Sequence, residues 1–378
     1  MSGVDDRLVA ASLRPAATLS LRTEPGARFD VWRVELREAV IDAVQNFVGD
    51  RCVTDLRLAG VDIAADVLFD FVSDGKCLRS TFTYLGWLAG ATPDPAALRA
   101  AASFELLHIF ALLQDDVMDD SPLRRGRPSA HVRFADWHRE RGLGGSPERF
   151  GASAAVLLGD LCLVWAGQMM RESGLPEAAL QRGWPRYDAM RTELAVGQFA
   201  DLVNDAGGRP TLEDVLDVAR RKSGNYTVRR PLEIGGALSG CSEGTLTLLG
   251  RYGAAVGEAF QLRDDLLGIF GSPDVTGKPA GGDLSEHKAT SVVVAAHRLA
   301  DASVRSQLTE LMAQRVLHDS DIARWQNLIA ATGAVQWIEQ LIDRRLNHAL
   351  DRISSSRLDD TVRAALVNMA AICTQRAA

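Results

Sequence analysis

The sequence predicts an all-α fold in a single domain, and three observations support this. Apolar residues recur every three or four positions through most of the chain, which is the period of a helix with one buried face. No segment shows a sustained alternation of apolar and polar residues, as a half-buried strand would. No proline-rich linker divides the helical part of the 378 residues. We expect one helical domain over residues 29–378, preceded by a flexible extension, residues 1–28.

The helical period allows the expected helices to be placed in chain order. The first apolar stripe consists of Trp32, Leu36, Val40, Val44 and Phe47. The same period continues in seven later segments: 96–119, 151–171, 187–205, 212–222, 245–270, 288–300 and 359–373. Breaks rich in glycine and proline separate several of them: residues 91–95, 141–147, 206–210 and 271–273.

Composition excludes several classes of function and partner. The formal net charge of −7 argues against nucleic acid as a partner. The five cysteines are odd in number and show no Cys-x-x-Cys spacing, which argues against both a disulfide framework and a zinc site. No basic-then-apolar signal begins the chain, and no run of about 18 uninterrupted apolar residues occurs. We therefore expect a cytoplasmic protein without a transmembrane segment.

Two clusters of aspartates lie inside segments that are otherwise apolar and helical. The first contains Asp115, Asp116 and Asp119, and the second contains Asp264 and Asp265. On a helix, Asp115 and Asp119 share one face, one turn apart. Neighbouring carboxylates repel each other unless a cation lies between them. Because Mg²⁺ favours a few carboxylates together with substrate phosphates, the two clusters predict a clamp that holds a diphosphate through bridging Mg²⁺.

The lysines point to the same chemistry. The chain has 42 lysines and arginines together, of which only four are lysines: Lys76, Lys222, Lys278 and Lys288. Each lies in a context rich in glycine or hydroxyl side chains. A compact ammonium group donates to phosphate in a way that the planar fork of arginine does not imitate. We therefore expect these four lysines to bind phosphate groups.

With these residues in place, the chain resembles the trans-isoprenyl diphosphate synthases, or polyprenyl synthetases. The motifs are dense over residues 65–295, and eight of them occur in the order of the family. They are Asp-Gly-Lys76-Cys-Leu-Arg79, Glu105-Leu-Leu-His108 with the first aspartate cluster, Leu-Arg124-Arg125-Gly-Arg-Pro, Gly159-Asp160, Gly197-Gln198-x-x-Asp201, Lys222-Ser223-x-x-Tyr226, Phe260-Gln261 with the second cluster, and Gly277-Lys278-x-x-Gly-x-Asp283-Leu.

The resemblance implies a fold, an activity and partners. The fold would be the isoprenoid synthase helical bundle, with a central cleft between two helices that are rich in aspartate. The activity would be that of a short-chain prenyltransferase, which condenses isopentenyl diphosphate with an allylic diphosphate such as dimethylallyl, geranyl or farnesyl diphosphate. The reaction would proceed by ionisation, condensation and loss of a proton. The resemblance also implies a homodimer.

The resemblance assigns roles to individual residues. Asp115, Asp119 and Asp264 would ligate three Mg²⁺ ions, supported by Asp116, Asp201 and Asp265. The allylic diphosphate would contact Arg124, Lys222 and Lys278. Isopentenyl diphosphate would be bound by Lys76, Arg79, His108 and Arg125, with Lys288 adding positive charge near the phosphates. The oxygen dipoles of Ser223 and Gln261 would face the carbocation.

The sequence departs from the family pattern at four positions within these motifs. Gly268 replaces the third aspartate of the second cluster, so metal binding there is expected to be looser. Cys77 and Ser80 replace a common arginine and a common proline in the motif that contains Lys76. His287 stands where a glycine is usual. None of these changes removes an expected metal ligand.

Other functions remain open at the level of sequence. A class I terpene cyclase also uses an Asp-Asp-x-x-Asp helix, but it would carry a glutamate in its second motif, and the residues after Asp265 contain none. A catalytically silent partner subunit would usually have degraded aspartate clusters, whereas both pairs are present here. Within the family, farnesyl diphosphate synthases and longer-chain synthases are the alternatives.

The expected product is geranylgeranyl diphosphate, a C20 compound. A chain growing away from the clamp would run along the helix that carries Asp115, and Phe110 lies about 7.5 Å before Asp115 on that helix. Phe110 is a plausible floor for the tunnel, and the neighbouring Ala111 is small. One aromatic in this region, without an insertion in the first cluster, resembles synthases that stop at C20. Farnesyl diphosphate is the second expectation.

Overall fold

The computed structural model describes residues 21, 27–205, 210–272, 281–314 and 316–375. The all-α prediction is confirmed: the described residues form helices, apart from loops and two strands of two residues each, β1 (Leu123–Arg124) and β2 (Arg127–Pro128). The first helix begins at Ala27, and most of the expected extension, residues 1–28, lies outside the described residues.

The chain forms two compact units by the pattern of its contacts. The first unit contains residues 1–84, 92–122 and 129–176, and the second contains residues 85–91, 123–128 and 177–378. The expectation of one domain over residues 29–378 stays a prediction.

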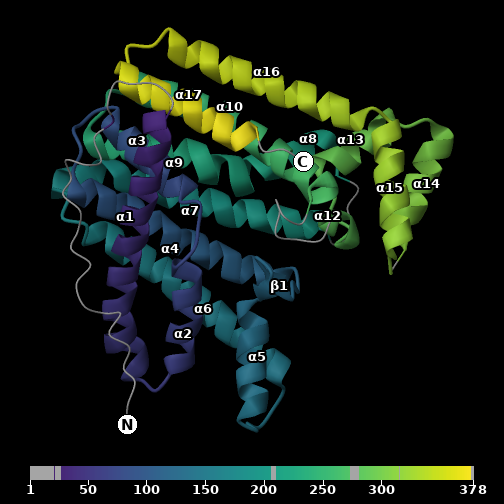
Figure 1. The fold of residues 1–378 in the computed structure, drawn as a ribbon, viewed down its shortest axis with the longest axis horizontal. Helices are drawn as coiled ribbons and strands as arrows, with labels where there is room; N and C mark the ends of the chain where they lie inside the picture. Colours follow the sequence, from purple (N-terminus) through teal and green to yellow (C-terminus); the bar gives the residue numbers. More distant parts are fainter. Residues whose placement is uncertain (1–20, 22–26, 206–209, 273–280, 315, 376–378) are drawn as a thin grey trace. The chain divides into compact units, whose positions relative to one another are not determined.

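The first unit is built around two long helices. Its elements are α1 (Ala27–Arg51), η3 (Cys52–Arg57), α2 (Asp62–Val72), most of α3 (Leu78–Leu88), α4 (Pro95–Met118), α5 (Ala130–Glu140) and α6 (Pro147–Arg171). Helix α4 packs against α6 and α1, and α5 packs against α6 (Figure 1). Asp94 fixes the beginning of α4, because its carboxylate accepts hydrogen bonds from the amides of Ala96 and Ala97, and Pro95 occupies the first helical position.

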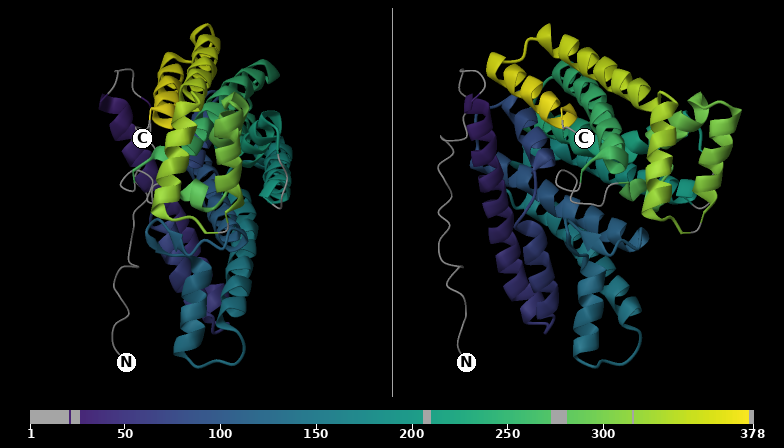
Figure 2. Two further views of the ribbon diagram at one scale, coloured as in Figure 1. Left: turned by 90° about the vertical axis from the view of Figure 1, so that its right-hand side faces the viewer. Right: turned by 45° about the vertical axis from the view of Figure 1, so that its right-hand side comes forward.

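The second unit is arranged around α10. Its elements after the strands are α7 (Glu177–Asp205), α8 (Leu212–Ala219), η4 (Arg220–Arg229), α9 (Arg230–Ser239), α10 (Glu243–Phe270), α12 (Gly282–Ser285), α13 (Ser291–Leu299), α14 (Ala302–Ala313), α15 (Asp319–Ala331), α16 (Ala334–Ser354) and α17 (Asp360–Thr374). Helix α10 packs against η4, α9, α16 and α17. The yellow-green α14 and α15 run side by side in the views of Figure 2.

The structure extends one expected helix through a proline. The predicted helix 187–205 corresponds to α7, which begins at Glu177 and contains Pro185. A proline inside a helix removes one backbone hydrogen bond. The complete burial of Tyr187 and Met190 just beyond it offsets this loss by packing, so the helix continues.

Two helices are long and apolar enough to cross a membrane by length and composition alone. They are α4 and α6, and 67% and 44% of their most apolar windows are buried within the described structure. The core helix of a globular protein passes the same test, so this finding is weak evidence for a membrane span.

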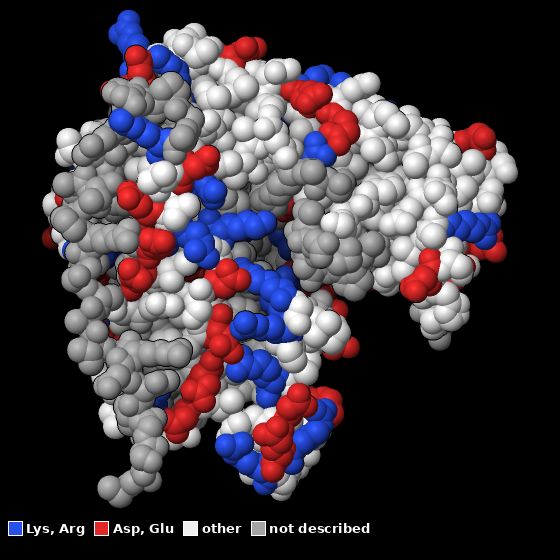
Figure 3. Space-filling model, in the orientation of Figure 1, with Lys and Arg blue, Asp and Glu red and all other residues white. Residues whose placement is uncertain are grey.

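The face drawn in Figure 3 carries acidic and basic side chains together and is not dominated by one sign of charge.

Candidate active site

The first aspartate cluster lies at the carboxyl end of α4. The amide of Asp119 donates to the carbonyl oxygen of Asp115 at 2.9 Å, so the two residues are one helical turn apart, as the sequence predicts. Both are partly exposed, whereas Asp116 is completely buried. This difference supports a direct ligand role for Asp115 and Asp119 and a supporting role for Asp116.

The loop that carries Lys76 is held at its backbone. Arg37 donates from Nε to the carbonyl oxygen of Gly75 at 2.6 Å, and Lys76 itself is exposed. Cys77 has a φ of 48°, in the left-handed region, and its carbonyl oxygen accepts from the hydroxyl of Thr81 at 2.7 Å. These contacts fix the backbone on both sides of Lys76.

Ser80 connects this loop region to the helix of the first cluster. Its hydroxyl donates to Glu105 Oε1 at 2.7 Å. Glu105 lies on α4, three residues before His108, so the segment with Lys76 and Arg79 is tied to the helix that carries His108. The proline that is common at position 80 in the family has no hydroxyl to make this bond.

Arg124 and Arg125 lie in a tight hairpin that the sequence did not predict. In the strand register Arg124 pairs with Arg127, and the turn between them consists of Arg125 and Gly126 with φ values of 53° and 74°. Positive φ at both central residues is the geometry of a type I′ turn. The hairpin therefore fixes the backbone from which both expected phosphate ligands project.

In the second unit, Lys222 and Ser223 lie on η4, a π-helix. Such wide turns within helices often occur at functional sites. The Lys222 ammonium donates to Asp201 Oδ2 at 2.6 Å, and both side chains are largely buried. The structure therefore brings together two of the residues that were expected to act on the allylic diphosphate and its metals.

Glycines allow the helices around Lys222 to touch through their backbones. A Cβ atom added to Gly197 on α7 would lie 2.7 Å from the amide nitrogen of Lys222. A Cβ atom on Gly257 of α10 would overlap the carbonyl oxygen of Gly224 on η4. Gln261 follows one turn after Gly257 on α10. Close packing of α7, η4 and α10 therefore brings the helical segments that carry these candidate residues together.

Asp265 of the second cluster is buried and accepts hydrogen bonds at both carboxylate oxygens. One carboxylate oxygen accepts from the amide of Ser291 at 3.0 Å and from its hydroxyl at 2.6 Å, and the other accepts from Gln261 Nε2 at 2.8 Å. Burial raises the pKa of Asp265, and the bonds from Ser291 and Gln261 oppose that shift. Asp264 is partly exposed, which supports the division into a ligand, Asp264, and a supporting residue, Asp265.

Gly268, where the family has a third aspartate, lies in close contact with a carboxylate from another element. A Cβ atom added to Gly268 would overlap the carboxylate of Asp283, on α12, whose Cγ would be only 2.5 Å away. The space that a third aspartate side chain would use is therefore filled by a carboxylate from another element. The sequence contains both residues, but nothing in their spacing shows this contact.

The segment after Asp283 contains another departure from the family pattern, His287, and another lysine, Lys288. His287 has a φ of 56°, a conformation that favours glycine, and its ring nitrogen contacts the carbonyl oxygen of Gln314 at 2.7 Å. The Lys288 ammonium forms an ion pair with Glu286 at 2.9 Å. Lys278 lies outside the described residues.

The donor set fits Mg²⁺ that is bound together with a diphosphate. Among the described residues, no three histidine, cysteine or acidic side chains converge on one point. Mg²⁺ does not need such a cage, because it usually retains water and binds one or two carboxylates plus substrate phosphates. Asp115 with Asp119, and Asp264 on α10, are donors of this kind.

The sequence was compared with models of known protein families. A family model described as polyprenyl synthetase matches residues 62–329. The chain belongs to the polyprenyl synthetase family. The all-α isoprenyl synthase fold and the prenyltransferase activity expected from the motifs are thereby confirmed.

Individual relatives have products of several lengths. The chain is 32% identical over 292 residues to the geranylgeranyl diphosphate synthase of Mycobacterium tuberculosis, covering 77% of each chain. It is 30% identical to the geranylfarnesyl diphosphate synthase of Aeropyrum pernix, covering 78% of this chain and 88% of the relative. The (2E,6E)-farnesyl diphosphate synthase of Mycobacterium bovis is 29% identical, with 80% of each chain covered.

A solved structure supports the fold and the use of a divalent metal in the family. The geranylgeranyl pyrophosphate synthase of Corynebacterium glutamicum, complexed with isoprenyl diphosphate and magnesium, matches with a TM-score of 0.87 and 35% identity, covering 91% of this chain and 99% of that one. The chain is a short-chain-type trans-prenyltransferase of a family that uses divalent metal.

Proposed function

We propose that the protein is a geranylgeranyl diphosphate synthase that condenses isopentenyl diphosphate with allylic diphosphates. The observation that carries the proposal is the pair Asp115 and Asp119, which are partly exposed one turn apart at the end of α4. The chain also belongs to the polyprenyl synthetase family and retains Asp264. Because both aspartate clusters are present, a catalytically silent subunit is disfavoured.

The allylic half of the reaction requires stabilisation of a leaving diphosphate. We propose that Asp115, Asp119 and Asp264 hold three Mg²⁺ ions, while Asp116, Asp201 and Asp265 orient them. When bound, Mg²⁺ neutralises the negative charge that develops on the leaving group. Lys222 is already held by Asp201, and it would donate to the same diphosphate together with Arg124 and Lys278.

The isopentenyl half requires a separate anion site. We propose that Lys76, Arg79, His108 and Arg125 bind isopentenyl diphosphate, with Lys288 adding positive charge. In the first unit the bond between Ser80 and Glu105 ties the segment with Lys76 and Arg79 to the helix of His108, which supports their action as a group. The amide of Gln261 is oriented by its donation to Asp265, so its oxygen would be available, with Ser223, to face the carbocation.

The two lysines provide a test of this partition. Lys76→Ala should mainly raise the KM for isopentenyl diphosphate, and Lys222→Ala should mainly impair use of the allylic substrate. Lys76→Arg and Lys222→Arg should restore activity only partly, because a planar fork does not replace a compact ammonium donor. Steady-state kinetics with each substrate varied in turn measures this. Equal effects of both alanine variants on both substrates would contradict the partition.

The length of the product is proposed from α4. Phe110 is partly exposed, whereas the neighbouring Ile109 is buried in the core. An aromatic side chain that is not fully packed can border a cavity, and Phe110 lies about 7.5 Å along the helix before Asp115. We propose that Phe110 is the floor of the tunnel and that the small Ala111 leaves space for a C20 chain, with farnesyl diphosphate as the second candidate product.

Changes at these two positions should alter the product in opposite directions. Phe110→Ala should lengthen the products beyond C20, because it removes the floor. Ala111→Phe should shorten them towards C15, because it adds a second aromatic. Chromatography of the dephosphorylated products from wild type and both variants measures the distribution. The same distribution in all three proteins would place the floor elsewhere.

We propose that the protein acts as a homodimer in the cytoplasm. Helix α7 exposes Val196, Phe199 and Val203 at helical spacing, and α6 exposes Leu157 and Val164 seven residues apart. Exposed apolar stripes of this kind often mark protein interfaces. Sedimentation velocity should give about twice the chain mass of 40.8 kDa, and a fully active monomer would be inconsistent with the proposal.

A further inference from the structure

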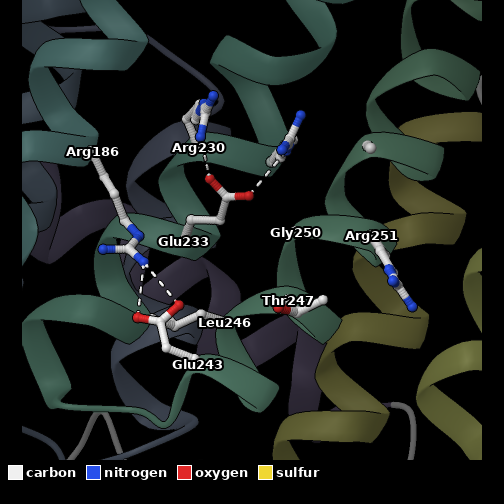
Figure 4. A pocket seen from close by; sticks show the side chains of 10 residues that line it. Arg186, Arg230, Glu233, Glu243, Leu246, Thr247, Gly250 and Arg251 are labelled. Carbon is white, nitrogen blue, oxygen red and sulfur yellow. Dashed lines mark hydrogen bonds and ion pairs between the residues drawn. The ribbon is translucent and has the colours of Figure 1, made fainter.

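The second unit contains a pocket that the proposed reaction does not use. Figure 4 shows it between α7, the end of η4, α9 and the first half of α10. Its volume is about 450 Å³, within the range of small-molecule sites. Six charged side chains line it: Arg186, Arg229, Arg230, Glu233, Glu243 and Arg251.

Glu233 neutralises two of the four arginines. Its carboxylate accepts from Arg229 Nε at 3.0 Å and from Arg230 Nη1 at 2.6 Å, and Arg230 also pairs with Glu193. A Cβ atom at Gly250 would overlap Glu233 Oε1, so glycine makes room for this buried carboxylate. These contacts leave the inner charges paired and held in place.

The other two arginines are available to an anion. Arg186 contacts the Glu243 carboxylate at 3.3 Å and 3.5 Å, and the Glu243 side chain is 84% exposed. An ion pair that faces water contributes little free energy, so an anion can displace Glu243 from Arg186 at small cost. Arg251 is exposed, and among the described residues it has no hydrogen-bond or ion-pair partner. Figure 4 shows Arg186 and Arg251 on different sides of the pocket, with Thr247 between them.

The charge of the lining selects the chemistry of a ligand. Four arginines face two glutamates there, although the whole chain has a net charge of −7. Guanidinium groups bind phosphate oxygens in a bidentate manner, and the amino end of α10, which begins at Glu243, adds a positive helix dipole. Among the residues that the structure describes, Leu246 and Ala254 are the only apolar side chains in the lining, so a prenyl tail has little to pack against.

On α7 and α10 the pocket is far from the residues proposed for the reaction, whereas on η4 Arg229 follows Lys222 by seven residues, or roughly 10 Å. On α7, Arg186 precedes Asp201 by about four turns, or roughly 22 Å. On α10, Thr247 precedes Asp264 by nearly five turns, or roughly 25 Å. An anion in this pocket would therefore occupy a second site, separate from that of the diphosphates that the proposed reaction consumes and releases.

We propose that this pocket binds a small phosphate-bearing anion, with Arg251 and Arg186 as its principal ligands. The shared chemistry is a phosphate group without a long apolar chain. The ligand would be free inorganic phosphate or pyrophosphate, or a small phosphorylated metabolite.

The test is calorimetric titration of the full-length protein without Mg²⁺ at constant ionic strength. Inorganic phosphate, pyrophosphate and glycerol 3-phosphate are titrated separately, so that the preferred one identifies the source. We expect saturable binding that Arg251→Gln and Arg186→Gln each weaken by about tenfold, the loss of one charge-assisted ligand. Arg298→Gln is the matched control, because Arg298 is an exposed arginine on α13, outside the lining.

Lys222→Ala separates the pocket from the reaction site. Binding that is lost in Lys222→Ala and retained in Arg251→Gln would assign the anion to the reaction site and overturn the proposal. Equal weakening by Arg251→Gln and Arg298→Gln would show a general charge effect, and absence of saturable binding to the wild type would also overturn it. Loss in both pocket variants, with Arg298→Gln and Lys222→Ala unchanged, supports the second site even if the proposed reaction is wrong.

Discussion

Asp115→Ala and Asp264→Ala should each lower turnover by about 10² or more, the scale typical of removing one major electrostatic element. Each change removes a carboxylate from one of the two aspartate clusters, so the charge on the leaving diphosphate is less well neutralised. The fold should persist, because both side chains are partly exposed. Steady-state turnover at saturating Mg²⁺, together with the melting temperature, measures both effects.

Asp120→Ala is the matched control for this experiment. Asp120 is next to Asp119, its side chain is fully exposed, and it is not expected to bind metal. It should retain nearly normal turnover, because a carboxylate that faces water contributes little to the clamp. Near-normal turnover in both Asp115→Ala and Asp264→Ala would disprove the assignment of the metal ligands.

Exchange of residues 268 and 283 should reveal whether Asp283 supplies the missing carboxylate of the second cluster. Gly268→Asp alone should lower the melting temperature, because its Cβ atom would overlap the Asp283 carboxylate. Asp283→Gly alone should weaken Mn²⁺ binding in the presence of pyrophosphate by about tenfold or more, the usual cost of losing a group that supports a metal site. The double variant Gly268→Asp, Asp283→Gly should recover most of both losses.

Non-additivity is the decisive feature of that exchange. Residues in direct contact show an interaction energy in a double-mutant cycle, whereas independent residues give additive effects. Electron paramagnetic resonance of Mn²⁺ and thermal unfolding measure binding and stability separately from activity. If the double variant is as impaired as the two single changes combined, Asp283 does not replace the third aspartate.

The sequence predicts the helices well where an apolar stripe is long. The predicted helix 245–270 is α10, and 96–119 is α4, because each contains several turns of one buried face. The hairpin at Arg124 escaped prediction because strands of two residues contain no period. The π-helix η4 also escaped, since the predicted helix 212–222 ends instead at Ala219 and continues as a wider turn that packs on α10.

In the candidate site, the sequence predicts the functional residues but not the contacts that hold them in place. Asp115, Lys222 and Asp264 could be found from the sequence because their residue types and spacing match a family pattern. The contacts that hold them come from distant parts of the chain. Ser291 donates a hydrogen bond to Asp265, and the Asp283 carboxylate fills the space at Gly268. Neither contact could be predicted from the residues that precede and follow these positions. The pocket of Arg186 and Arg251 has no motif at all.

The central claim is that the protein joins isopentenyl diphosphate to an allylic diphosphate. The most direct measurement is incubation of the purified protein alone with Mg²⁺, radiolabelled isopentenyl diphosphate and dimethylallyl diphosphate. The account predicts that the label enters a C20 diphosphate and that pyrophosphate is released once for each unit added. Pyrophosphate release from an allylic diphosphate without isopentenyl diphosphate, with a hydrocarbon as product, would contradict it, as would the absence of any turnover.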